Sequence, residues 1–188
     1  MYDSVLFNIK LAEKQSHILE KLKLKPKSYA LATIHRPENT DDSKRLNSIF
    51  LGLDKIAQNG LSVVVPLHPR TKQEIKVFGL RNLQSKIENL QFVDPGSYLD
   101  MLLLEKQAHV IVTDSGGVQK EAYWFKVPCV TLRDETEWVE TLESGWNVLV
   151  GSEPPRIIEA VDKAQPGSML QDAYGNGRAA DRIVYMLS

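Results

Sequence analysis

The segment that decides the fold is Ala108–Phe125, which reads AHVIVTDSGGVQKEAYWF. Its apolar, β-branched run Val110–Val112 ends at a polar turn with two glycines, and a helical pattern follows. A strand that leads through paired glycines into a helix leaves the first N–H groups of that helix without partners, at the positive end of the helix dipole. Because such N–H groups bind anions, the segment predicts a strand, a phosphate-binding turn and a helix.

Four residues of this segment are candidate ligand contacts. Gly116 and Gly117 lack a Cβ atom, so an anion can approach their backbone closely. Ser115 adds a hydroxyl donor, and Glu121, one turn into the helix, can accept hydrogen bonds from sugar hydroxyls. Together these residues predict a nucleotide site. The alternative is that Ser115 or Asp114 only caps the helix and that Glu121 is a surface carboxylate favoured near a helix N-terminus.

Composition limits the classes of protein that this chain can represent. Its 188 residues, 43% hydrophobic and 25% charged, predict one globular domain with a substantial core. The net charge of −1 gives no electrostatic reason to expect nucleic acid or an anionic membrane as a partner. The single cysteine, Cys129, lies in an apolar run where burial is expected, and it excludes a disulfide framework. Without a signal peptide or an apolar run of membrane-spanning length, the expectation is a soluble cytoplasmic protein.

Strand and helix patterns alternate along the chain. The continuous apolar runs are typical of strands buried on both faces of a parallel sheet. Right-handed crossovers then make a doubly wound, Rossmann-like α/β sheet the simplest topology. The expected strands are Tyr29–Ile34, Leu61–Leu67, Leu90–Val93, Val110–Val112, Pro128–Leu132 and Asn147–Val150.

Helices are expected between and around these strands. Capping signals mark some of their starts, namely Asp41 or Asp42, Ser97, and a capping box at Thr71–Glu74. Further helical patterns fall before Pro26, from Gly116, before Glu143, and over Pro155–Ala164 and Arg178–Leu187.

Polar residues follow the predicted strands at the edge where such sheets bind ligands, beyond the carboxyl ends of the strands. Loops are polar in any case, but two histidines and three arginines together with a glycine turn favour an anionic ligand. In chain order these residues are His35, Arg36, Glu38, His68, Arg70, Pro95, Gly96, Ser115–Gly117, Arg133 and Glu137.

Several common sites are not supported by the sequence. The dinucleotide fingerprint G-x-G-x-x-G and the lysine loop G-x-x-x-x-G-K-[ST] do not occur. The four histidines and Cys129 do not have metal-ligand spacing, so neither a metal nor a cofactor is expected. His17 is expected on the surface and His109 in a structural role. His35 directly follows a strand, so it can donate to a phosphate; the alternative is a turn ordered by His35–Glu38 contacts.

Three motifs carry a family resemblance. T-I-H-R-P-E-N at Thr33–Asn39, T-D-S-G-G-V-Q-K-E-A at Thr113–Ala122 and L-R-D-E-T-E at Leu132–Glu137 resemble those of the non-hydrolysing UDP-N-acetylglucosamine 2-epimerases. G-x-G-x-A-x-x-R-I at Gly175–Ile183 is similar to the C-terminus of that family. Members are two-domain proteins of the glycosyltransferase-B type, with the active site between two Rossmann-like domains. The resemblance implies that residues 1–188 are the C-terminal, UDP-binding domain and that the N-terminal domain, with the catalytic acid and base, is absent from this chain.

The resemblance also implies a reaction. UDP leaves C1 of UDP-N-acetylglucosamine by anti elimination, which gives 2-acetamidoglucal, and adds back with inversion at C2 to give UDP-N-acetylmannosamine. A domain that holds UDP with fixed donors stabilises this leaving group.

Residue roles follow from the matching positions. For His35 a catalytic, electrostatic role beside the diphosphate is implied. UDP binding is implied for the glycine turn, the ribose carboxylate, the uracil pocket and a nearby arginine, which are Ser115, Gly116, Gly117, Glu121, Gly96, Met101 and Arg133. Near the region where bacterial members bind a second UDP-sugar as an allosteric activator, accessory roles fall to Arg36, Glu38 and His68.

One position departs from the family pattern. Bacterial members commonly read T-E-R-P-E, with the arginine reaching UDP, whereas this chain has Trp138 at the third place. Either Arg133 compensates for the missing charge, or binding relies on stacking and backbone donors. Trp138 can also be a helix-packing aromatic residue.

The expectation is therefore that the full-length protein is a homodimeric epimerase, whereas this chain binds UDP weakly, has no measurable turnover and can be a monomer. Two other functions remain open. One is a glycosyltransferase of the same architecture that moves N-acetylglucosamine to a lipid acceptor, although this half shows no apolar or basic patch for membrane docking. The other is a non-catalytic sensor of nucleotide sugars.

Overall fold

The computed structural model describes residues 1–78, 89–168 and 173–187. All pairings in its six-stranded sheet are parallel, and the strand order is β3-β2-β1-β4-β5-β6. This order confirms the predicted doubly wound α/β fold. The strands are β1 (Tyr29–Thr33), β2 (Ser62–Pro66), β3 (Leu90–Val93), β4 (Val110–Thr113), β5 (Cys129–Thr131) and β6 (Asn147–Leu149).

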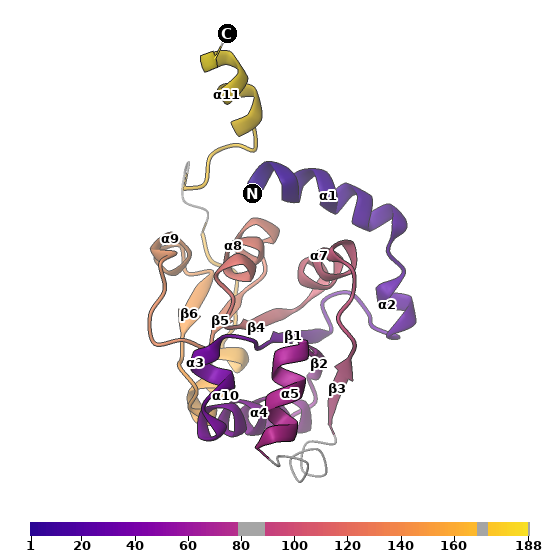
Figure 1. Ribbon diagram of the computed structural model, residues 1–188, viewed down its shortest axis with the longest axis vertical. Coiled ribbons are helices and arrows are strands. Elements are labelled where there is room, and N and C mark those ends of the chain that lie inside the picture. Colours follow the sequence, from indigo (N-terminus) through magenta and orange to yellow (C-terminus); the bar gives the residue numbers. More distant parts are fainter. Residues whose placement is uncertain (79–88, 169–172, 188) are drawn as a thin grey trace.

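Helices cover both faces of the sheet (Figure 1). α7 (Tyr98–Gln107) and α8 (Gly116–Phe125) lie against one face, and α1 (Tyr2–Gln15) and α2 (Ile18–Lys21) pack on α7. Against the other lie α4 (Ser43–Gln58), α5 (Pro69–Val77) and α10 (Pro154–Asp162). Two short helices, α3 (Pro37–Thr40) and α9 (Val139–Glu143), follow β1 and β5.

The central strands are apolar throughout because both of their faces are covered. Every residue of β1 and β4 is buried, and alternate side chains enter the two cores. Leu31 and Ile111 belong to the core that includes α7, whereas Ala32 and Val112 belong to the core that includes α4. Removing these side chains from water stabilises the sheet, by about 1.5–3 kcal/mol for each large aliphatic group.

Two of the predicted helix starts are confirmed by their caps. The carboxylate of Asp42 accepts hydrogen bonds from the N–H groups of Lys44 (2.8 Å) and Arg45 (3.2 Å) at the start of α4. Ser97 and Asp100 form a capping box at the start of α7. Each cap pairs N–H groups that the helix itself leaves without acceptors.

Two predictions about helices are wrong. Thr71–Glu74 is not a capping box, because α5 already begins at Pro69, and Nδ1 of His68 accepts a hydrogen bond from the N–H of Arg70 (3.2 Å). The Thr71 hydroxyl instead donates to the Ile34 carbonyl. The amphipathic stretch before Pro26 forms two helices rather than one, since the chain turns at Ser16, whose hydroxyl donates to Asp100.

The last helix, α11 (Ala179–Leu187), lies apart from the sheet, beyond α1 (Figure 1). None of its residues is buried, although five of the nine are large and apolar. Over the described ranges, no helix has the length and apolar character needed to cross a membrane.

Candidate functional site

A cavity of about 310 Å³ opens at the carboxyl ends of β1, β2 and β4, between α7 and α8. This is the sheet edge where the sequence places a ligand, and the volume is at the lower end of the range of small-molecule sites. The cavity is lined by Thr33, Ile34, His35, Pro66, His68, Pro95, Tyr98, Met101, Glu105, Ser115, Val118 and Glu121.

Asp114 organises the wall that carries His35. Its fully buried carboxylate accepts hydrogen bonds from the N–H groups of His35 (3.1 Å) and Arg36 (3.0 Å) and from Nδ2 of Asn39 (3.1 Å). Nδ1 of His35 lies 3.2 Å from Oδ1 of Asp114. The turn after β1 is therefore ordered by Asp114 rather than by Glu38, and Nε2 of His35 remains for a ligand.

A second histidine stands beside the first. The rings of His35 and His68 have centroids 5.4 Å apart and are tilted by 37°. Because Nδ1 of His68 accepts from the N–H of Arg70, its proton lies on Nε2, and His68 enters the cavity as a donor. Both histidines therefore lie on the wall built by β1 and β2.

The opposite wall is the first turn of α8. Ser115 is its N-cap, and Ser115 Oγ lies 3.5 Å from the N–H of Val118. A helix supplies no acceptor for the N–H groups of Gly116 and Gly117, so these donors are free for an anion. A Cβ on Gly117 would have no atom nearer than 3.6 Å, whereas a Cβ on Gly116 would lie 2.7 Å from Nε1 of Trp138. Gly116 is thus required by packing, and Gly117 is not.

Trp138 is a packing residue in this structure. Its indole is half-buried against the start of α8, and Nζ of Lys120 lies 3.5 Å from the centroid of the ring. This cation–π contact and the packing on Gly116 agree with the structural alternative for this position.

Glu121 shares the floor of the cavity with a second carboxyl group, that of Glu105 on α7. Glu121 is only 7% exposed and is hydrogen-bonded to Glu105, which is 3% exposed. Burial raises the pKa of Glu121 to about 7, although the hydrogen bond from Glu105 and the charge of Lys120 lower it. Glu121 is therefore a buried acceptor and not a surface carboxylate.

The three arginines do not leave free positive charge at this edge. Arg70 binds both carboxylate oxygens of Asp41 at 2.6 and 2.8 Å, away from the cavity lining. Arg133, which is buried, donates to Glu137 at 2.8 Å and lies 3.9 Å from Glu38, and Arg36 lies 3.9 Å from Glu137. The donors that remain for an anion at the cavity include the α8 N–H groups, the Ser115 hydroxyl and Nε2 of His68.

The cavity therefore collects only part of the predicted set. His35, His68, Met101, Ser115 and Glu121 line it. Gly116, Gly117 and Gly96 adjoin lining residues without lining the cavity themselves, and a Cβ on Gly96 would lie 2.8 Å from Cβ of Asp100. Arg36, Glu38 and Arg133 do not line the cavity and instead take part in ion pairs.

The lining residues that were not predicted from the sequence include two with ionisable side chains, Tyr98 and Glu105. With Met101 they occupy positions i, i+3 and i+7 of α7, which lie on one face of a helix. The helical spacing of Tyr98, Met101 and Glu105 was therefore the sequence signal that could have placed all three at the site.

The remaining histidine and cysteine predictions have mixed outcomes. His17 is exposed, as expected, but His109 is also exposed, so its expected structural role in a core strand is wrong. Cys129 is buried, and burial raises the pKa of its thiol to about 12. Within the described part of the chain, no group of three or more potential metal ligands occurs.

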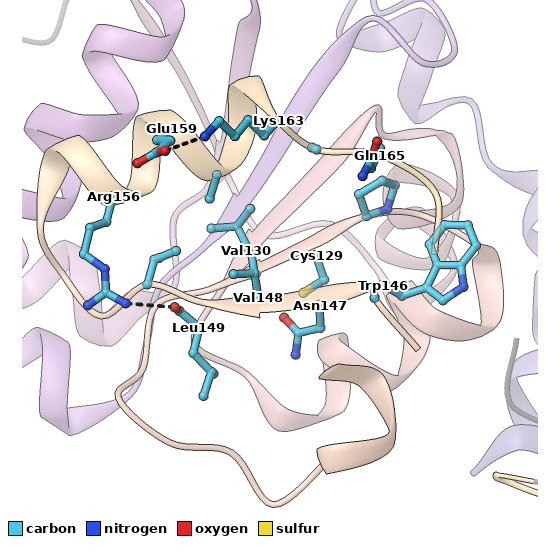
Figure 2. A pocket seen from close by; sticks show the side chains of 15 residues that line it. Cys129, Val130, Trp146, Asn147, Val148, Leu149, Arg156, Glu159, Lys163 and Gln165 are labelled. Atoms are coloured by element: carbon cyan, nitrogen blue, oxygen red, sulfur yellow. Dashed lines mark hydrogen bonds and ion pairs between the residues drawn. The ribbon is translucent and has the colours of Figure 1, made fainter. Parts of the chain in front are cut away.

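A second hollow of about 360 Å³ runs beside β5, β6 and α10 (Figure 2). Its lining extends along these strands, from Pro128 and Trp146 just before them to Val150 just after β6. Its charged side chains are paired: Lys163 binds Glu159 at 2.6 Å, and Arg156 donates to the Leu149 carbonyl at 3.2 Å (Figure 2). The first cavity, which has free donors and a buried carboxylate, is thus the better candidate site.

A doubly wound sheet with free helix N–H groups and a buried acceptor at its carboxyl edge defines a nucleotide-binding α/β protein. The family model described as UDP-N-acetylglucosamine 2-epimerase matches residues 1–188. The chain belongs to this family.

Relatives and solved structures agree with this assignment. A UDP-N-acetylglucosamine 2-epimerase homolog of Methanococcus maripaludis is 44% identical over 100% of this chain and 52% of its own length. The UDP-2,3-diacetamido-2,3-dideoxy-D-glucuronate 2-epimerase of Pseudomonas aeruginosa is 47% identical over 85% of this chain and 44% of its own length. The Methanocaldococcus jannaschii UDP-GlcNAc 2-epimerase, solved with UDP-GlcNAc and UDP, aligns with 99% of this chain and 52% of its own (39% identity, TM-score 0.88). The chain spans about half the length of the relatives it matches.

Proposed function

We propose that this chain is the C-terminal, UDP-binding half of an epimerase that interconverts UDP-N-acetylglucosamine and UDP-N-acetylmannosamine. The observation that carries the proposal is the cavity between α7 and α8, because it sets free backbone donors opposite a buried carboxylate in a chain of this family.

In this proposal each part of UDP meets a different wall of the cavity. The diphosphate accepts hydrogen bonds from the N–H groups of Gly116 and Gly117 and from Ser115, with Nε2 of His35 facing it from β1. The ribose hydroxyls donate to Glu121. The uracil lies toward Met101 and the backbone at Gly96. Arg133 acts from outside the lining, through its ion pair with Glu137.

This arrangement favours departure of UDP. Cleavage of the bond from C1 to the diphosphate oxygen gathers negative charge on UDP, and donors already fixed in place stabilise that charge without reorganising. His35 is held by Asp114 and is therefore a fixed group as well.

Proton transfer at C2 requires a base and an acid in addition to UDP binding. The carboxyl groups that line this cavity, Glu105 and Glu121, are hydrogen-bonded to each other, and Glu38 faces Arg133. We therefore place the base and the acid in the other half of a full-length, homodimeric enzyme. Roles for Arg36, Glu38 and His68 toward a second UDP-sugar stay predictions.

The Pseudomonas relative supports a second candidate substrate. Its name specifies UDP-2,3-diacetamido-2,3-dideoxy-D-glucuronate, and it is 47% identical over the matched residues. Both substrates contain UDP and an acetamido group at C2, so the same cavity and the same inversion at C2 serve either one.

The test is incubation of the full-length protein with each UDP-sugar in D₂O, without any acceptor. The proposal predicts formation of the C2 epimer with deuterium at C2, and the faster substrate identifies the sugar. Sugar transfer that requires an acceptor would establish the glycosyltransferase alternative, and binding without turnover would establish the sensor. The 188-residue chain alone is expected to bind UDP weakly and to release no epimer.

A further inference from the structure

Glu105 is a buried carboxyl group with no cationic partner among the residues that the structure describes. It lies on α7, is 3% exposed and lines the same cavity as Glu121. Its Oε2 atom has no hydrogen-bond partner there, and its carboxyl group is hydrogen-bonded to Glu121.

Two carboxyl groups in such contact require a proton between them, because two buried anions would repel strongly. Glu105 is the more deeply buried of the two, and burial together with the nearby Glu121 charge raises its pKa well above its ordinary value. Glu105 is therefore the protonated partner, so its O–H donates and Glu121 accepts.

We propose that Glu105 is a positioning residue: its protonated carboxyl group donates a hydrogen bond to Glu121 and holds the Glu121 carboxylate with its free lone pairs toward the ribose hydroxyls of UDP. This inference rests on the proposed function. Without the donor, Glu121 would take up a proton more easily and lose acceptor capacity for the ribose.

Other titratable groups face this pair from the neighbouring elements. Tyr98 comes from α7, Tyr29 from β1, Cys129 from β5 and Lys120 from α8. Burial raises the pKa of both tyrosines and of the cysteine, so they stay neutral near pH 7.

His35 and His68 also line the cavity. A single pH profile of UDP binding would not isolate the contribution of Glu121. The test therefore compares variants that share both histidines.

The experiment compares the 188-residue chain with Glu105→Gln, which keeps a donor, and Glu105→Leu, which does not. UDP binding is measured by calorimetry from pH 6 to 9, and the Glu121 carboxyl carbon is titrated by NMR in the ligand-free proteins. We expect the wild type and Glu105→Gln to share one Glu121 midpoint. In Glu105→Leu the midpoint rises by about one pH unit and UDP binding at pH 7 weakens about ten-fold.

A second ligand separates positioning from general damage to the cavity. UDP without the ribose 2′ and 3′ hydroxyls should bind equally to all three proteins, because it has nothing to donate to Glu121. Thermal unfolding should show that both variants fold.

An unchanged Glu121 midpoint in Glu105→Leu, or an equal shift in Glu105→Gln, would overturn the positioning role. The NMR titration needs no ligand, so it decides this point even if the wild type does not bind UDP. Absence of UDP binding to the wild type would instead refute the proposed function.

Discussion

The buried carboxylate of Asp114 lies 3.2 Å from Nδ1 of His35 and accepts a hydrogen bond from the backbone N–H of the same residue. The end of β4 thereby fixes the turn that follows β1. The same stretch of chain continues through Ser115 into α8, so one segment orders both walls of the cavity.

The Asp114 contacts predict a large effect of Asp114→Asn. The asparagine amide offers one acceptor oxygen where the carboxylate offers two, and its NH₂ group would face other donors. We expect the free energy of unfolding to fall by about 2–4 kcal/mol, measured by urea denaturation. The matched control is Asp134→Asn, because the exposed Asp134 pairs with Arg45 alone (3.3 Å) among the described residues, so this variant should change stability by less than about 1 kcal/mol. Equal stability of the two variants would contradict this role of Asp114.

Alanine substitutions at the two glycines of the α8 turn are expected to differ in their effect on stability. In Gly117→Ala the new Cβ has space, so the fold should keep its stability or gain up to about 1 kcal/mol. UDP binding should still weaken at least ten-fold, because the methyl group occupies the approach to the backbone donors. In Gly116→Ala the clash with Trp138 should lower stability as well. Calorimetry and thermal unfolding measure both effects, and undiminished UDP binding by Gly117→Ala would exclude this turn as the phosphate site.

The buried Glu121 carboxylate is expected to lower the stability of the fold while it favours UDP binding. Burial raises its pKa from 4.5 to about 7, so the folded state holds a proton that the unfolded chain has lost at intermediate pH. The contribution of Glu121 to the free energy of unfolding therefore falls between about pH 4.5 and 7 and is constant above that range. Glu121→Gln removes this penalty and should be more stable than the wild type by about 2–3 kcal/mol at pH 8, with little difference at pH 4.

The same variant should bind UDP poorly, since Gln offers the ribose a weaker, neutral acceptor. Denaturation at the two pH values and calorimetry at pH 8 give both readouts. A variant that is less stable than the wild type at pH 8 would contradict the burial of a charged Glu121.

Substitutions of Trp138 are expected to act through packing and not through the absence of a positive charge at this position. Trp138→Ala removes an indole that covers the start of α8 and the contact with Lys120, so the free energy of unfolding should fall by about 2 kcal/mol. Trp138→Phe keeps an aromatic face and should retain most of both stability and UDP binding. If Trp138→Arg bound UDP far more tightly than the wild type, the absence of an arginine at this position would matter more than packing.

The sequence predicted the sheet well because its strands are buried on both faces and therefore apolar without interruption. That topology also placed the ligand site at the carboxyl ends of the strands. A cavity at this edge is lined by His35, Met101, Ser115 and Glu121. Caps such as Ser97 were readable because their partners lie within three residues.

What the sequence did not predict depends on side-chain pairings, some of them between residues far apart in the chain, and on one misplaced helix start. The arginines were counted as ligand donors, but Arg70 binds Asp41 and Arg133 binds Glu137. Glu105 stands in an apolar run where its pairing with Glu121 on another helix leaves no local trace. The start of α5 was misplaced because Pro69 at the first helical position competes with the capping signal at Thr71.

The central claim is that UDP binds between the first turn of α8 and the carboxyl pair of Glu105 and Glu121. A crystal structure of the 188-residue chain with UDP tests it most directly. The account predicts the diphosphate at the N–H groups of Gly116 and Gly117 and the ribose hydroxyls at Glu121. UDP seated in the hollow beside β6 and α10, or elsewhere on the molecule, would contradict it.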